Sequence, residues 1–70
     1  MKKLQKLYEI RTSRGVLQSD MAKELKISTA FYNQIENKQR RLTYYMAVGI
    51  AKIFDMKPDE LFFDEFSKAK

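Results

Sequence analysis

The side chains best suited to chemistry lie between residues 28 and 41, and they are amides, hydroxyls and cations. Asn33 and Gln34 each carry an amide that can pair with adenine through two hydrogen bonds. Thr29 and Ala30 offer methyl groups that can contact a thymine methyl. Three cations follow within four positions, namely Lys38, Arg40 and Arg41. These residue types predict polar recognition of a partner. None of them is a nucleophile with a neighbouring base to activate it.

Catalysis is disfavoured by what the 70 residues lack. The chain has no His and no Cys, which excludes the common zinc sites, Ser-His-Asp triads and imidazole bases. Paired carboxylates, a glycine-rich phosphate loop and metal-ligand spacing are also missing from the sequence. We therefore expect no enzyme activity, no cofactor, no metal and no small-molecule ligand.

Length and hydropathy predict one small soluble domain. Residues 1–66 are expected to form it, with a short tail over 67–70. The basic N-terminus lacks the continuous apolar stretch of a signal peptide, and no run approaches the roughly 20 apolar residues needed to cross a bilayer. A cytoplasmic protein without membrane contact is expected.

The charge is unevenly distributed. Residues 1–54 carry a net charge of +7 and residues 55–70 carry −2, giving +5 for the chain. The larger part is suited to an anionic partner, although Lys and Arg also solubilise ordinary helix surfaces. Charge alone therefore decides little.

Five short helices are expected. Gly15 is suited to end the first, Ser28 and Thr43 to cap two others, and Pro58 to begin the last. Apolar residues recur at three- and four-residue steps between these signals. The expected ranges are 2–14, 18–26, 29–37, 44–54 and a short helix from 58. In the fourth helix the inward positions would be Tyr44, Ala47, Val48, Ile50, Ala51 and Phe54.

Residues 18–37 have the pattern of a helix-turn-helix. Ala22 supplies the small residue where the two helices meet, and Ile27 supplies an apolar residue to seal the turn. In the second helix Tyr32 and Ile35 would face the core. The opposite face, available to the major groove of DNA, would hold Thr29, Ala30, Asn33 and Gln34.

From Leu7 to Phe62 the chain resembles the Cro/cI-type helix-turn-helix family, also called the XRE family. The matching residues are Arg11, Arg14-Gly15-Val16, Gln18, Ala22, Leu25-Lys26-Ile27-Ser28, Ile35-Glu36-Asn37, Ile50-Ala51-Lys52 and Asp59-Glu60-Leu61-Phe62. The resemblance implies an all-α, compact five-helix bundle of the lambda-repressor-like type. Its second and third helices would form the helix-turn-helix, with the third, about 29–37, in the major groove of double-stranded DNA.

The resemblance also implies an internal ion pair between Arg11 and Glu36. A guanidinium and a carboxylate joined by two hydrogen bonds have a fixed geometry. Such a pair would hold the third helix against the rest of the bundle.

Further roles follow from the resemblance by position. Base contacts are expected from Thr29, Ala30, Asn33 and Gln34. Phosphate contacts are expected from Gln18, Ser28, Asn37, Lys38, Arg40 and Arg41. Phe31 has two possible positions: it could contact a sugar or thymine methyl, or cover Ile27 and Ile35, and we favour partial burial.

Four residues depart from the family pattern. Leu17 stands where Ser or Thr commonly caps the second helix, which would cost about 1 kcal/mol if no other group caps it. Lys26 and Lys38 stand at common glycine positions, and Leu42 replaces a frequent Pro. These changes affect turns and the loop path without removing the fold.

The aromatic C-terminal segment suggests a homodimer. Leu61, Phe62, Phe63 and Phe66, with a possible contribution from Phe54, are expected to form a symmetric contact. Alternatively, Leu61 and Phe62 complete the core of one protomer and only Phe63 and Phe66 are exposed.

The sequence thus predicts a dimeric, sequence-specific transcriptional regulator, a repressor by default, that binds palindromic half-sites. The first alternative is an antitoxin-like or other protein-interaction module that binds a partner protein through its helical surface. A catalyst that uses Glu or Lys is the weaker alternative. Co-purification of a second polypeptide would distinguish the first alternative from the regulator.

Overall fold

A computed structural model describes residues 3–67, apart from the side chains of residues 64, 66 and 67. It has five helices: α1 (Gln5–Ser13), α2 (Gln18–Leu25), α3 (Thr29–Glu36), α4 (Tyr44–Ile53) and α5 (Pro58–Ser67). No strand occurs in that part of the chain. The predicted all-α five-helix bundle is confirmed. Apart from Ser67, the tail expected over 67–70 lies outside the described residues.

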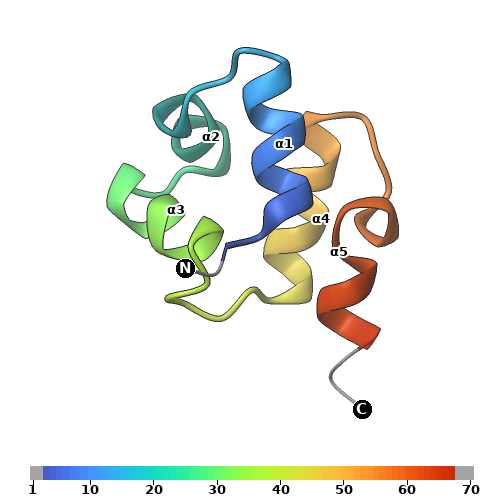
Figure 1. Ribbon diagram of the computed structural model, residues 1–70. Coiled ribbons are helices and arrows are strands. Elements are labelled where there is room, and N and C mark those ends of the chain that lie inside the picture. The colour runs from blue at the N-terminus through green and yellow to red at the C-terminus, as the bar shows by residue number, and fades with distance from the viewer. Residues whose placement is uncertain (1–2, 68–70) are drawn as a thin grey trace.

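The helices pack around α4. α2 and α5 both contact α4, α3 packs on α2, and α1 packs on α5 (Figure 1). At Gly49 of α4 an added Cβ would lie 3.1 Å from Cδ2 of Leu25, so the glycine allows α2 to approach closely. No helix within residues 3–67 has the length and apolar character needed to span a membrane.

Hydroxyl caps begin two of the helices, as predicted. The Ser28 Oγ accepts a hydrogen bond from the N–H of Phe31 at 3.0 Å, and the Thr43 Oγ1 accepts one from Met46 at 3.1 Å. Leu17 has no acceptor for this purpose, but the carboxylate of Asp20 accepts the Leu17 N–H at 3.0 Å. Asp20 thus supplies half of a capping box at the start of α2.

Four helices are followed, one or two positions after their last residue, by a residue with positive φ. Gly15 has a φ of 69°, and Lys26, Lys38 and Asp55 have φ between 57° and 60°. At each of these ends the next N–H reaches back to a carbonyl five residues earlier, as Val16 does to Arg11 at 3.0 Å. The three residues with a Cβ bear a strain of about 1 kcal/mol each that glycine avoids. Lys26 and Lys38, which stand at common glycine positions of the family, thus adopt the left-handed conformation that glycine favours.

The first helix begins later than the apolar pattern predicted. α1 starts at Gln5, and the Leu4 N–H donates to the carbonyl of Glu36 at 2.7 Å. That bond ties the chain before α1 to the end of α3, so Leu4 is a cap residue and not part of the helix.

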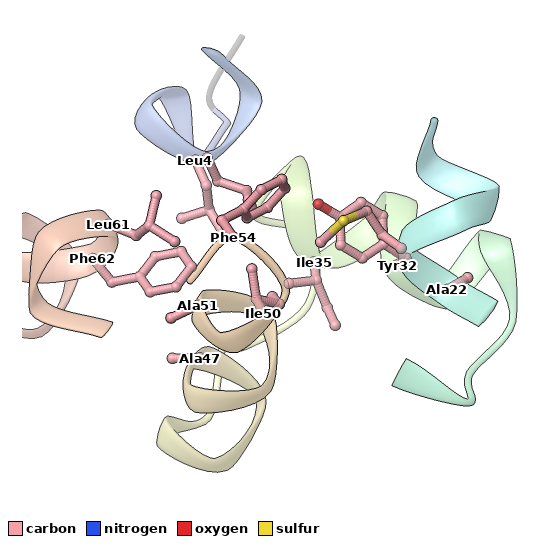
Figure 2. Packing of buried hydrophobic residues seen from close by; sticks show 12 residues of the cluster. Leu4, Ala22, Tyr32, Ile35, Ala47, Ile50, Ala51, Phe54, Leu61 and Phe62 are labelled. Carbon is pink, nitrogen blue, oxygen red and sulfur yellow. The ribbon is translucent and has the colours of Figure 1, made fainter. Parts of the chain in front are cut away.

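Every helix contributes to a single core. Figure 2 shows Tyr32 and Ile35 of α3 on one side and Phe62 of α5 pointing toward Ala51 of α4 on the other. The fully buried positions also include Leu7, Met21, Ala47 and Ile50. Tyr44, expected to face inward, is instead 62% exposed because it occupies the first turn of α4, beyond the edge of the core.

The predicted dimer surface requires a correction. Leu61 and Phe62 are 5% and 1% exposed, and Phe54 is 2% exposed, because Leu61 and Phe62 point from α5 toward α4 and Phe54 packs in the core near Leu4 (Figure 2). They complete the core of one protomer and cannot form an intersubunit contact. Phe63 is 65% exposed, and the side chain of Phe66 lies outside the described residues.

Candidate nucleic-acid interface

The junction of α2 and α3 is built as the sequence pattern predicted. Ala22 is 2% exposed, and its carbonyl accepts the N–H of Ile27 at 3.0 Å. Ile27 is half-buried and packs against the core. A small residue at position 22 lets the turn fold back over α2, and this fixes the direction in which α3 leaves.

The two faces of α3 have different environments. Tyr32 and Ile35 are buried, whereas Thr29 and Ala30 at its start are exposed. Asn33 and Gln34, the other two predicted base-contacting residues, are half-buried. Phe31 is also half-buried and packs against the core, so partial burial is confirmed.

A buried ion pair holds the end of α3 against α1. The Arg11 Nε donates to Glu36 Oε2 at 2.7 Å, and its Nη2 donates to Glu36 Oε1 at 2.9 Å. The third nitrogen, Nη1, donates to the carbonyl of Val16 at 2.8 Å. The predicted pair is therefore present, in the two-bond geometry that restricts rotation of both side chains.

Glu36 is the centre of a buried hydrogen-bond network. Besides Arg11, the Tyr32 hydroxyl donates to it at 3.0 Å and Gln18 Nε2 donates at 2.8 Å. Burial opposes ionisation, but the donors from Arg11, Gln18 and Tyr32 outweigh burial and lower the pKa of Glu36. The lowered pKa means that the carboxylate is held in its ionised form. Among the described residues no buried side-chain polar atom lacks a hydrogen-bond partner.

Two of the three donors to this carboxylate, Arg11 and Tyr32, are held protonated. The hydrogen bond to Glu36 raises the pKa of Arg11. Burial, followed by the nearby Glu36 charge, raises the pKa of the Tyr32 phenol well above its ordinary range. Each therefore remains a donor, and the direction of every hydrogen bond to Glu36 is fixed.

The network continues outward to Asn33, on the side of α3 that holds the predicted base-contacting residues. Because an ionised carboxylate only accepts, Gln18 must turn its NH₂ toward Glu36 and its oxygen away. That oxygen accepts a hydrogen bond from Asn33 Nδ2 at 3.1 Å. The sequence did not predict this relay and indicated only a phosphate contact for Gln18, because no spacing rule relates positions 18, 33 and 36.

A second cluster lies on the outer edge of α3. Arg40 Nε donates to Gln34 Oε1 at 3.0 Å, and the Arg40 guanidinium carbon lies 4.5 Å from the centroid of the Phe31 ring. Phe31 and Gln34 are three positions apart and therefore share one side of the helix. The sequence placed Arg40 in a phosphate-contacting loop and gave no signal that it folds over α3.

The remaining predicted phosphate contacts surround the ends of α3. Ser28 is exposed, Asn37 is half-buried, and Lys38 and Arg41 are exposed. Lys38 Nζ forms an ion pair with Glu65 of α5 at 3.2 Å. In the described part of the chain there is no cluster of acidic side chains that could hold a metal ion.

Comparison with known proteins agrees with this geometry. Residues 7–61 match the family model described as Helix-turn-helix. Over 51 residues, 73% of the chain, the sequence is 37% identical to the HTH-type transcriptional regulator PrpR of Mycobacterium tuberculosis. The chain spans about 10% of the length of that relative. No solved structure matches the chain significantly.

Proposed function

Because the chain belongs to the helix-turn-helix family of the XRE type, with a lambda-repressor-like fold, we propose that it is a sequence-specific regulator of transcription that binds double-stranded DNA. The observation that supports this best is the exposed edge of α3, whose orientation is set by the buried Arg11–Glu36 pair. A rigidly held helix with polar residues outward is what the major groove admits. The proposal includes no catalytic or cofactor role.

In this proposal α3 enters the major groove. Thr29 and Ala30, exposed at the N-terminal end, would contact base edges or thymine methyl groups. Asn33 and Gln34, on the following turn, would offer amides to the bases. The relay through Gln18 supports the assignment of Asn33, because it sets the direction of that amide from inside the fold.

Contacts to the DNA backbone would come from both ends of α3. Before the helix these are Gln18 and Ser28, and after it Asn37, Lys38 and Arg41. The net charge of +5 favours association with a polyanion. Lys38 would exchange its ion pair with Glu65 for a phosphate.

A homodimer would place two copies of α3 on half-sites about one helical turn apart. The exposed Phe63 of α5 supports a contact through this helix, and Phe66 follows three positions later in the sequence. We propose that the protein represses transcription by blocking polymerase. Its proposed location is the cytoplasm. An antitoxin-like role is the outcome to be tested against it.

Selection of duplexes from a random pool tests the proposal. We expect the selected duplex to be palindromic and to bind tightly at about 50 mM salt and more weakly as the salt concentration rises. Gln34→Ala should change the selected sequence. Arg41→Ala should lower the affinity for all duplexes and reduce the salt slope by about one unit.

Two further measurements decide between the classes of function. Sedimentation that shows a monomer at tens of micromolar, with and without DNA, would refute the dimer. Failure to bind any duplex at low salt, together with co-purification of a second polypeptide, would replace the proposal with a protein-interaction module.

A further inference from the structure

Arg40 and Gln34 form a composite surface that comes from two segments of the chain. Gln34 lies on α3, and Arg40 lies four positions after the end of that helix. The Nε–Oε1 bond of 3.0 Å joins them, and the ring of Phe31, 4.5 Å from the guanidinium carbon, supports the cation from one side. The guanidinium therefore lies against the outer edge of α3, next to a predicted base-contacting amide.

The chemistry of this bond fixes the direction of the Gln34 amide. A guanidinium has five N–H donors and no acceptor, so the amide atom that faces it must be the oxygen. The NH₂ of Gln34 is consequently turned away from Arg40. The groups that remain for a ligand are this NH₂ and the two terminal nitrogens of Arg40, all of which are donors.

A surface of donors selects among the bases. In the major groove guanine presents two adjacent acceptors, N7 and O6. Adenine presents one acceptor beside one donor, and pairing with it requires Gln to offer an oxygen together with its NH₂. The Gln34 oxygen is already directed at a cation, so adenine is disfavoured.

We propose that Arg40 and Gln34 together read a guanine in each half-site, which makes Arg40 a specificity-determining residue and not only a phosphate contact. This inference rests on the proposed function, since it requires α3 to lie in the major groove. It reverses the preference for A·T pairs that the amide of Gln34 suggests when that residue is considered alone. Phe31 acts as a positioning residue that supports the guanidinium.

The test begins with the duplex selected by the wild-type protein. We expect an invariant guanine at one position of each half-site. Replacing it with 7-deazaguanine, which removes the N7 acceptor, should lower the affinity about tenfold. Inosine at the same position is the matched control: it keeps N7 and O6, loses only the minor-groove amino group, and should bind nearly as well as guanine.

Variants of the protein separate specificity from charge. Arg40→Ala and Arg40→Lys should both reduce discrimination between guanine and adenine at this position about tenfold, although the second keeps the positive charge. Arg41→Ala, the neighbouring exposed cation, should weaken binding to all sequences and leave the guanine preference unchanged. Circular dichroism should show that each variant remains helical.

The outcomes are distinct. If the selected site is palindromic but Arg40→Ala behaves like Arg41→Ala, or if the wild-type protein selects adenine there, Arg40 does not read guanine while the proposed function stands. If the wild-type protein selects no site at all, the proposed function fails, and the reading of guanine fails with it.

Discussion

On both the inner and the outer side of α3 a guanidinium donates to a side-chain oxygen, but the inner contact is buried and the outer one is exposed. On the inner side the Arg11 guanidinium meets the Glu36 carboxylate, and Arg11 is only 7% exposed. On the outer side the guanidinium of Arg40 meets the amide of Gln34 in solvent. Burial makes an unpaired charge costly, whereas an exposed charge is solvated by water. The inner contact is therefore expected to determine stability, and the outer contact to determine what the surface can recognise.

Removing the cation of Arg11, on the inner side of α3, should have the largest effect on the free energy of unfolding. Arg11→Ala leaves the Glu36 carboxylate buried with its main partner gone, and we expect a loss of about 3–5 kcal/mol in the free energy of unfolding. For a domain of this size that is a large part of the total stability. Urea denaturation followed by circular dichroism at constant protein concentration measures the change.

Two controls accompany this variant. Lys6→Ala, an exposed change in the same helix, should alter stability by no more than about 0.5 kcal/mol. Replacing both partners, Arg11→Met with Glu36→Leu, should recover part of the loss, because no charge is left buried although the Tyr32 hydroxyl loses its acceptor. A loss below about 1 kcal/mol in Arg11→Ala would show that the inner pair does not anchor α3.

Acid should lower the free energy of unfolding by protonating Glu36 on the inner side of α3. The pKa of Glu36 is lower in the folded protein than in the unfolded chain. The ionised carboxylate therefore contributes stability above the unfolded pKa of about 4.3, and this contribution is lost as pH falls through the folded pKa. We expect a smaller loss than in Arg11→Ala, measured as urea midpoints between neutral pH and acid.

Glu36→Gln isolates the contribution of this group, because the other carboxylates titrate in both proteins. The variant should be less stable than the wild type at neutral pH, and the difference should shrink below about pH 4. Parallel stability curves over the whole range would mean that Glu36 is not the titrating group.

Removing the outer cation should have the smallest effect on folding. Arg40→Ala breaks an exposed hydrogen bond and an exposed cation–π contact, so we expect a loss of about 0.5 kcal/mol. Thermal denaturation should place its midpoint within a few degrees of the wild type. A loss above about 2 kcal/mol would make Arg40 structural and remove the contrast between the two sides.

The fold could be predicted from local signals. Gly15 and Pro58 mark helix ends by their backbone preferences, Ser28 and Thr43 mark them by their capping hydroxyls, and the apolar steps between these residues define the inner faces. The starting point of α1 could not be predicted, because it depends on the bond from Leu4 to the carbonyl of Glu36, which local preferences do not encode.

The site was only partly predictable. The Arg11–Glu36 pair followed from resemblance, and the exposed positions on α3 followed from helical spacing. The position of Arg40 over Phe31 depends on the path of an irregular loop, which periodicity does not describe. The aromatic count of the C-terminal segment likewise did not show that Phe62 would be buried, because composition does not say which way a kinked helix turns its side chains.

Arg11 also has a consequence for motion. Its three donor nitrogens reach Glu36 at the end of α3 and the carbonyl of Val16 in the connection between α1 and α2. Detachment of α3 would break the bonds of Glu36 to Arg11 of α1 and to Gln18 of α2 at once, so the lowest-energy opening of this helix involves its neighbours as well. The surface proposed to meet DNA therefore belongs to the same cooperative unit as the core, and α3 fluctuates with the whole domain and not as a separate arm.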